Sequence, residues 1–341
     1  MTDKRSGVKT INLALQGGGS HGAFTWGVMD RLLEEDSIAI EGIVGTSAGA
    51  LNGAVAAYGI ALGGNAGARE ALAAFWRRVA DDAKFSPLQP TWLDQKLSPG
   101  NLDWSPAYHW IEALTRAVSP YQLNPGNHNP LREILEASVD FSVLRRSNVR
   151  LYTCASNVLT GRIRVFECHE ASADTVLASA CLPHMFQAVE VDGEHYWDGG
   201  YMGNPPLFPL IYNCGSRDVL LVMVNPIEIK EVPTTANAIL DRVNTLSFNS
   251  NLMREMRAIN FVTHLIDGGF DDNGRLKRML LHTIDAADQM RELSASSKLN
   301  VSWDFLVWLR DLGRARAGAF LDEHYDKLGR VSSTDIAQRF L

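Results

Sequence analysis

The sequence Ile-Asn-Leu-Ala-Leu-Gln-Gly-Gly-Gly-Ser-His-Gly at residues 11–22, together with Ile-Ala-Ile-Glu-Gly-Ile-Val-Gly-Thr-Ser-Ala-Gly at 38–49, decides the fold of this chain. In each stretch a short apolar run without helical period leads into a glycine cluster, which predicts a buried strand that ends in a tight loop. Apolar residues at helical spacing follow over 23–35, and an alanine-rich helical stretch continues to about residue 62. This order predicts a parallel sheet with helices on its faces.

Later segments continue this pattern and then change it. Further strand-like runs occur at 149–155, 163–166 and 219–224. Residues 84–130 interleave prolines with aromatic residues, which predicts turns and short helices. Two interpretations are open for these aromatics: they cover a substrate pocket as a lid, or they close over the sheet as ordinary core. We expect a main domain at 8–228 and, packed on it, an extension at 229–341 that is mainly helical apart from an apolar run at 279–284.

Composition restricts the class of protein. The 341 residues are 46% hydrophobic and 21% charged, which is typical of a globular protein. A net charge of −7, from 32 Lys and Arg against 39 Asp and Glu, argues against nucleic-acid binding. No run reaches the roughly 18 apolar residues that cross a bilayer, and no signal peptide is visible, so we expect a cytoplasmic protein. The four cysteines are interpreted as buried thiols rather than as disulfides or zinc ligands.

The segment Gly45-Thr46-Ser47-Ala48-Gly49 matches the pattern Gly-x-Ser-x-Gly between a strand-like and a helical stretch. In that context the serine lies on a strained turn, and only glycine on each side permits the close approach of the backbone. The turn exposes the hydroxyl and places the first N–H groups of the next helix near a developing negative charge. Ser47 is therefore a candidate nucleophile.

The loop Gly17-Gly18-Gly19-Ser20-His21-Gly22 has two interpretations. It matches Gly-x-Gly-x-x-Gly after a strand, which cradles a dinucleotide pyrophosphate, and Glu41 lies about the right distance onward to contact a ribose. Alternatively, its bare N–H groups bind the oxyanion of an ester under attack. A dinucleotide-binding fold does not need a nucleophile turn after its second strand, whereas an esterase needs both loops side by side. We therefore favour the oxyanion loop and keep a dinucleotide-binding protein as an alternative.

A serine nucleophile needs a base, and the sequence offers two kinds. A triad would use a late histidine, and the candidates are His264, His282 and His324, none of which lies in a distinctive local setting. Asp198, in Asp198-Gly199-Gly200, is a sharper candidate, because the glycines permit an unusual backbone that directs the carboxylate toward the serine hydroxyl. Taken alone, this aspartate would be interpreted as a turn residue that caps its own backbone.

Together, the segments at 17–22, 45–49 and 198–200 resemble those of the patatin-like phospholipase family, and a further stretch at 178–186 matches in character. The resemblance covers about residues 10–225 and implies a three-layer α/β/α fold with a mainly parallel sheet. It also implies a Ser47–Asp198 dyad without histidine, which cleaves acyl esters of lipids with no metal or cofactor. The residues that it assigns to the oxyanion hole are Gly17, Gly18, Gly19 and Ala48, and those that support the motifs are Gly22, Gly45, Gly49, Gly199 and Gly200.

One position departs from the family, which often carries Arg or Lys where this chain has His21. A histidine is only partly charged near neutral pH, so electrostatic help at this position would be weaker or pH-dependent. The resemblance implies that residues 8–228 form a catalytic domain that acts as a phospholipase A, lysophospholipase or general lipid acyl hydrolase. Its partner would be a lipid or other acyl-ester substrate, with peripheral membrane contact. An intracellular polyester (polyhydroxyalkanoate) depolymerase would use the same dyad and stays open as an alternative.

Overall fold

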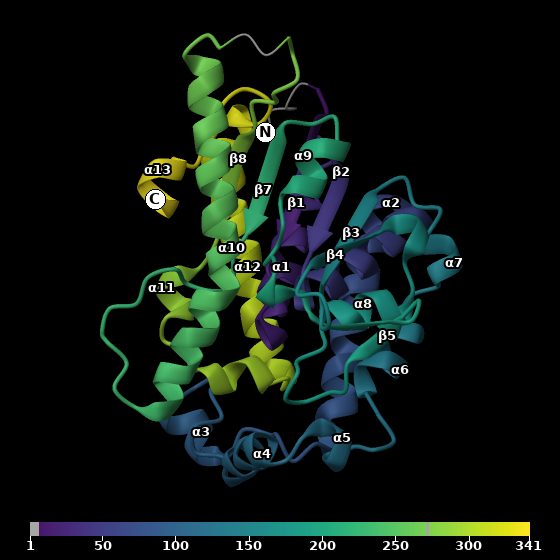
Figure 1. Ribbon diagram of the computed structural model, residues 1–341, viewed down its shortest axis with the longest axis vertical. Coiled ribbons are helices and arrows are strands. Elements are labelled where there is room, and N and C mark those ends of the chain that lie inside the picture. Colours follow the sequence, from purple (N-terminus) through teal and green to yellow (C-terminus); the bar gives the residue numbers. More distant parts are fainter. Residues whose placement is uncertain (1–6, 271–272) are drawn as a thin grey trace.

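One mixed sheet organises the residues that the computed structural model describes, which are 7–270 and 273–341 (Figure 1). Its strand order is β5-β6-β3-β2-β1-β7-β8, and β4 also pairs with β3. The strands are β1 (Lys9–Leu15), β2 (Ile38–Gly45), β3 (Arg150–Asn157), β4 (Ile163–Glu167), β5 (Val189–Val191), β6 (Glu194–Asp198), β7 (Asp218–Val222) and β8 (Leu280–Ile284). All of the strand-like runs of the sequence form strands, whereas β5 and β6 have too few apolar residues to give that signal.

The middle of the sheet is parallel and brings the ends of several strands to one edge. β1 pairs in parallel with β2 and β7, and Leu15 lies opposite Gly45. β2 is parallel to β3, where Gly45 lies opposite Thr153. β6 runs antiparallel to β3 and places Asp198 opposite Ala155, just beyond Thr153 along β3. The loops after β1 and β2 therefore meet Asp198 at the carboxyl edge of the parallel strands.

Helices cover both faces of the sheet. One face carries α1 (Gly22–Leu32), α2 (Ala48–Asp82), α8 (Ala173–Ser179) and α12 (Trp303–His324), and the other carries α9 (Phe208–Asn213), α10 (Ala236–Asp267) and α13 (Ile336–Phe340). The alternation of β1 explains the two cores, because Leu13 and Leu15 pack with the first set and Ala14 packs with the second. The predicted three-layer α/β/α fold with a helical C-terminal region is confirmed.

Shorter helices connect these layers. They are α3 (Trp92–Leu97), α4 (Pro106–Ala117), α5 (Pro120–Leu123), α6 (Pro130–Glu136), α7 (Phe141–Leu144) and α11 (Ala287–Met290), together with single 3₁₀ turns such as η1 (Gly19–His21) and η5 (Ala295–Leu299). Proline begins α4, α5 and α6, where its fixed φ suits the first turn and its missing N–H costs nothing. Within the described residues, we find no helix with the length and apolar character needed to cross a membrane.

The aromatic side chains of residues 84–130 are largely exposed. In Figure 1, α3, α4 and α5 lie along the lower end of the molecule, and α4 is hydrogen-bonded to the start of α10 through Arg116 and Asn237. Trp92, Trp104 and Trp110 are 69%, 52% and 67% exposed, whereas Tyr108 is 9% exposed. The interpretation of these aromatics as ordinary core is therefore wrong for most of them.

The C-terminal region packs at close range against the first helix. A Cβ on Gly27 in α1 would lie 1.9 Å from the carbonyl oxygen of Arg310, and one on Gly313 in α12 would lie 2.1 Å from that of Phe24. Only glycine permits this approach of the two helices. The same region adds β8, which pairs in parallel with β7, so it contributes to the sheet as well as to a helical layer. The domain boundary near residue 228 stays a prediction.

Candidate active site

Ser47 occupies the turn between β2 and α2 with a backbone conformation that serine rarely adopts. Its φ is 55° and its ψ is −123°, and such a positive φ raises the free energy of a residue with a side chain. A Cβ on Gly45 would lie 2.3 Å from the Gly49 carbonyl oxygen, and one on Gly49 would lie 2.2 Å from that of Leu15, so both must be glycine. Ser47 is partly exposed, and α2 begins directly after it. Close contacts also surround the remaining motif glycines, which are Gly22, Gly199 and Gly200.

Asp198 is fully buried at the end of β6, next to this turn. Its Oδ1 accepts a hydrogen bond from the Gly200 N–H at 2.7 Å. Its Oδ2 is buried and has no hydrogen-bond partner of standard geometry among the described residues. Burial raises the pKa of this carboxyl to about 6, against the lowering effects of the Gly200 N–H and the Ser47 hydroxyl. Because the Ser47 hydroxyl acts on this pKa, the two candidate reacting groups lie side by side.

The glycine loop after β1 also lies against Ser47. A Cβ on Gly17 would be 2.6 Å from the serine Cβ. The Gly17 N–H donates to Asn204 Oδ1 at 2.6 Å, so it is not available to an oxyanion, which corrects the expectation that all three glycines line the hole. By contrast, the N–H groups of three residues donate no hydrogen bond within the part of the chain that the structure describes; these are Gly18, Gly19 and Ala48.

His21 is buried in the same loop and is neutral. The residue is only 3% exposed, and its Nε2 lies 2.8 Å from Ser297 Oγ. Burial, and then the positive charge of Lys298, lower the pKa of the imidazole to about 3. The ring therefore carries no charge at neutral pH. The attraction for an anion that Arg or Lys would give at this position is missing here, so of the two expectations for His21 the structure favours weaker help over pH-dependent help.

The three histidines considered for a triad lie elsewhere. His282 in β8 is fully buried, with Nε2 at 3.0 Å from Asp218 Oδ1 and Nδ1 at 2.9 Å from Ser333 Oγ. Asp218 begins β7, so this group lies toward the edge of the sheet opposite to the nucleophile turn. His264 is exposed near the end of α10, and His324 ends α12. None of the three is hydrogen-bonded to the candidate nucleophile or base in the described part of the chain.

Glu41 also lies away from the glycine loop. Its carboxylate accepts hydrogen bonds from the N–H groups of Gly215 at 2.6 Å and Ser216 at 2.7 Å, two residues that precede β7. The side chain is therefore held at the amino-terminal edge of the sheet, whereas the glycine loop follows the carboxyl end of β1. Because Glu41 is not placed to contact a ribose beside that loop, the structure gives no support to the dinucleotide interpretation.

Buried polar side chains to which the sequence assigned no role hold the two loops. Ser179 Oγ, at the end of α8, accepts a hydrogen bond from the Ser47 N–H at 3.0 Å. Asn204 accepts from the Gly17 N–H, and Asn225 Nδ2 donates to the Gly17 carbonyl oxygen at 2.7 Å. Each asparagine precedes a proline, and Asn225 closely follows the apolar run of β7. A polar side chain at the carboxyl end of a buried strand is the signal that could have identified Asn225.

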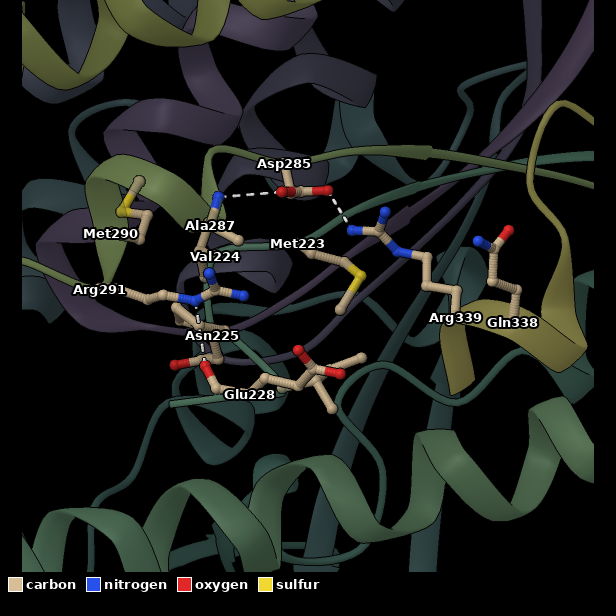
Figure 2. A pocket seen from close by; sticks show the side chains of 12 residues that line it. Met223, Val224, Asn225, Glu228, Asp285, Ala287, Met290, Arg291, Gln338 and Arg339 are labelled. Carbon is tan, nitrogen blue, oxygen red and sulfur yellow. Dashed lines mark hydrogen bonds and ion pairs between the residues drawn. The ribbon is translucent and has the colours of Figure 1, made fainter. Parts of the chain in front are cut away.

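Two cavities lie near the carboxyl ends of the strands. The larger, of about 610 Å³, is lined by His21, α4, the first half of α10 and the segment after α11. The smaller, of about 230 Å³, lies beyond the ends of β7 and β8 (Figure 2). There Arg339 pairs with Asp285, and Arg291 Nε donates to the Glu228 carbonyl oxygen at 3.1 Å, so both cations already have partners. Nowhere in the described chain do three His, Cys, Asp or Glu side chains form a group that could hold a metal ion.

Residues 13–211, which include both loops and the buried aspartate, match the model of the family described as patatin-like phospholipase. Among solved structures, VipD from Legionella pneumophila has a TM-score of 0.45 at 14% identity, covering 100% of this chain and 78% of that chain. A chain from the complex of full-length SpcU with full-length ExoU, of the Pseudomonas aeruginosa type III secretion system, has a TM-score of 0.36 at 15% identity, covering 93% of this chain and 53% of that chain. No curated protein matches the sequence.

The structural likenesses carry no argument about activity, because their TM-scores are below 0.5. The family match carries more weight, since it spans more than half of the 341 residues and contains the glycine loop, Ser47 and Asp198. The chain therefore belongs to the patatin-like phospholipase family, whose members are lipid hydrolases.

Proposed function

We propose that the protein hydrolyses acyl esters of lipids, with Ser47 as the nucleophile and Asp198 as the base. One observation supports this more than any other: a serine with a positive φ lies beside a buried carboxylate whose Oδ2 has no other partner. Both features raise the free energy of the folded state, and such features persist where a function requires them.

The chemistry follows from the protonation of Asp198. Its pKa of about 6 leaves it ionised at neutral pH, yet makes it a stronger base than an ordinary aspartate. It takes the hydroxyl proton as Ser47 Oγ attacks the ester carbonyl. The free N–H groups of Gly18, Gly19 and Ala48 then stabilise the negative charge on the carbonyl oxygen. Asp198 returns the proton to the leaving alcohol. It then deprotonates a water molecule that attacks the acyl-serine, and it passes this proton to Ser47 Oγ as the fatty acid leaves.

A lipid substrate also gives a role to the exposed aromatic segment. Tryptophan side chains suit the boundary between water and lipid, because each combines a large apolar ring with one polar N–H group. We therefore place Trp92, Trp104 and Trp110 in peripheral contact with the lipid surface that supplies the substrate. Weaker co-sedimentation of a Trp92→Ala, Trp110→Ala variant with phosphatidylcholine vesicles is expected, and unchanged co-sedimentation would exclude these residues from the contact.

Labelling with a fluorophosphonate, followed by peptide mapping, tests the nucleophile. We expect the label on Ser47 and no label on a Ser47→Ala variant. Asp198→Asn is expected to lower the turnover of an acyl ester by about 10⁴-fold, as loss of the acid does in a serine triad. His282→Gln is the matched control and should keep its activity, because that histidine is already bonded elsewhere. Near wild-type turnover by Asp198→Asn would refute the dyad.

A substrate panel then separates lipid from polyester. The panel compares a phospholipid, a lysophospholipid, a triacylglycerol and a polyhydroxyalkanoate, each with wild type and with Ser47→Ala as the blank. We expect Ser47-dependent release of fatty acid from the lipid esters. Release of hydroxyacid from the polyester alone would keep the dyad and overturn the lipid assignment.

A further inference from the structure

We propose that the segment Ser294–Ser297, in the C-terminal region, positions the oxyanion loop and couples it to the aromatic-rich residues 84–130. Within this segment, Ser297 is hydrogen-bonded to the loop, so it acts as a positioning residue rather than a catalytic one. The inference rests on the proposed function, since it takes the loop at 17–22 to be the oxyanion loop. The segment itself lies beyond residue 211, outside the part of the chain that matches the family.

Ser297 is fully buried and binds the loop at two points. Its carbonyl oxygen accepts a hydrogen bond from Ser20 Oγ at 2.7 Å, and its own Oγ lies 2.8 Å from His21 Nε2. The Ser297 hydroxyl donates its proton to the Ser294 carbonyl oxygen at 2.6 Å. The His21 ring and the Ser297 hydroxyl are thus hydrogen-bonded to each other. A neutral imidazole is suited to this contact, whereas a lysine or arginine at position 21 would bury a charge here.

The backbone of the loop is also pressed against Lys298, the residue that follows this segment. A Cβ on Gly19 would lie 2.4 Å from the Lys298 carbonyl oxygen, so the main chain of the loop rests directly on η5. Phe305, in α12, lies against the His21 ring with the two ring centroids 6.4 Å apart. The C-terminal region therefore supports the loop that carries the free N–H groups of Gly18 and Gly19.

The opposite side of the segment is bonded to residues 84–130. Asp103 Oδ1 accepts hydrogen bonds from Ser294 Oγ at 2.6 Å and from Ser296 Oγ at 2.7 Å. The Leu102 N–H donates to Ser296 Oγ at 2.8 Å. A continuous set of short hydrogen bonds thus runs from Asp103 through the serines to the oxyanion loop. A displacement of the aromatic-rich segment as lipid enters would move Ser294, which is hydrogen-bonded to the Ser297 hydroxyl that contacts the loop.

Two serine variants test the positioning role. Ser297→Ala removes the hydroxyl bonded to His21, and Ser333→Ala is the matched control, because that hydroxyl is bonded to the buried His282 at 2.9 Å, far from the loop. For Ser297→Ala we expect amide hydrogen exchange in a peptide covering 16–23 to be at least about fivefold faster. We also expect kcat to fall about 10- to 100-fold with KM within about twofold, since displacing an oxyanion donor affects the transition state. Ser297→Thr should restore most of both losses.

A double-mutant cycle tests the coupling. The cycle combines Asp103→Ala with Ser297→Ala. If Asp103→Ala does not fold, Ser296→Ala takes its place. Coupled residues should give a combined loss of kcat that is smaller than the product of the two single losses. A combined loss equal to that product would overturn the coupling to residues 84–130.

The exchange measurement separates this inference from the proposed function. Unchanged exchange at 16–23 in Ser297→Ala, or an equal change in Ser333→Ala, would overturn the positioning role even if the protein hydrolyses lipids. Faster exchange confined to 16–23 would support it even if no ester in the panel is hydrolysed.

Discussion

We expect the free energy of unfolding of an Asp198→Asn variant, relative to that of wild type, to increase as the pH rises. The same substitution removes the proposed base. The reason is the burial of the carboxyl, whose pKa rises from 3.8 to about 6 in the folded state. Below pH 3.8 the carboxyl is protonated in both the folded and the unfolded state, so its ionisation has no effect on stability. Between pH 3.8 and 6 the unfolded chain loses this proton and the folded protein keeps it. The free energy of unfolding of wild type therefore falls as the pH rises through that window.

The magnitude follows from the shift in pKa. About two pKa units, at 1.36 kcal/mol each, correspond to roughly 3 kcal/mol, which is fully lost above about pH 7. Asparagine does not ionise, so the variant lacks this loss. Its amide NH₂ would lie where the unpartnered Oδ2 lies, which costs a fixed free energy that does not depend on pH. The prediction is therefore the change with pH, and not the absolute difference between the two proteins.

Urea unfolding of both proteins from pH 4 to pH 8, followed by tryptophan fluorescence, measures this change. The difference between variant and wild type should rise by about 2.5 kcal/mol over that range, because the unfolded chain is already partly ionised at pH 4. Burial also raises the pKa of Glu255, to about 7. Glu255 changes the stability of both proteins with pH to the same extent, so its effect cancels in the difference. A difference that stays constant within about 0.5 kcal/mol would show that Asp198 titrates normally, and the argument for a desolvated base would then fail.

In steady-state assays of wild type on a soluble ester, kcat/KM should rise through about pH 6 as Asp198 ionises. The His282→Gln variant should show the same rise with pH. Gly313→Ala places a methyl group 2.1 Å from a main-chain oxygen of α1 and should destabilise the protein by about 2–3 kcal/mol in urea, whereas Gly318→Ala on the same helix, with nothing nearer than 4.0 Å, should change stability by less than about 1 kcal/mol. Ser179→Ala removes the acceptor of the nucleophile's N–H and should lower kcat about tenfold with little change in KM, which initial-rate measurements would detect.

The two loops could be predicted from the sequence because their signals are local. An apolar run that stops at a glycine cluster specifies both a buried strand and the turn after it. The glycines at 45 and 49 are required by contacts of 2.2–2.3 Å, so the motif reflects a steric requirement of that turn. Parallel pairing of β1 with β2 then brings the loops together without further information.

Other features depend on contacts that spacing along the chain does not reveal. Glu41 lies the expected number of residues after the glycine loop, but its carboxylate is bonded to Gly215 and Ser216 at the opposite edge of the sheet. The Gly17 N–H donates its hydrogen bond to Asn204 Oδ1, in a residue 187 positions away. The sequence of 84–130 does not indicate whether another layer covers its aromatic side chains, and in the structure most of them are exposed.

The proposed reacting groups and some of the contacts that hold the two loops come from different parts of the chain. The positive φ of Ser47 and the burial of the Asp198 carboxylate both raise the free energy of the folded state, so neither would persist in a site that is free to relax. The restraining contacts include Ser179 within the family-matched region, but also Asn225 and Ser297 beyond residue 211. The proposed dyad is thus encoded in the matched region, whereas the proposed oxyanion donors are also held by contacts from the C-terminal region. Changes in the C-terminal region are therefore expected to alter kcat while Ser47 and Asp198 stay in place.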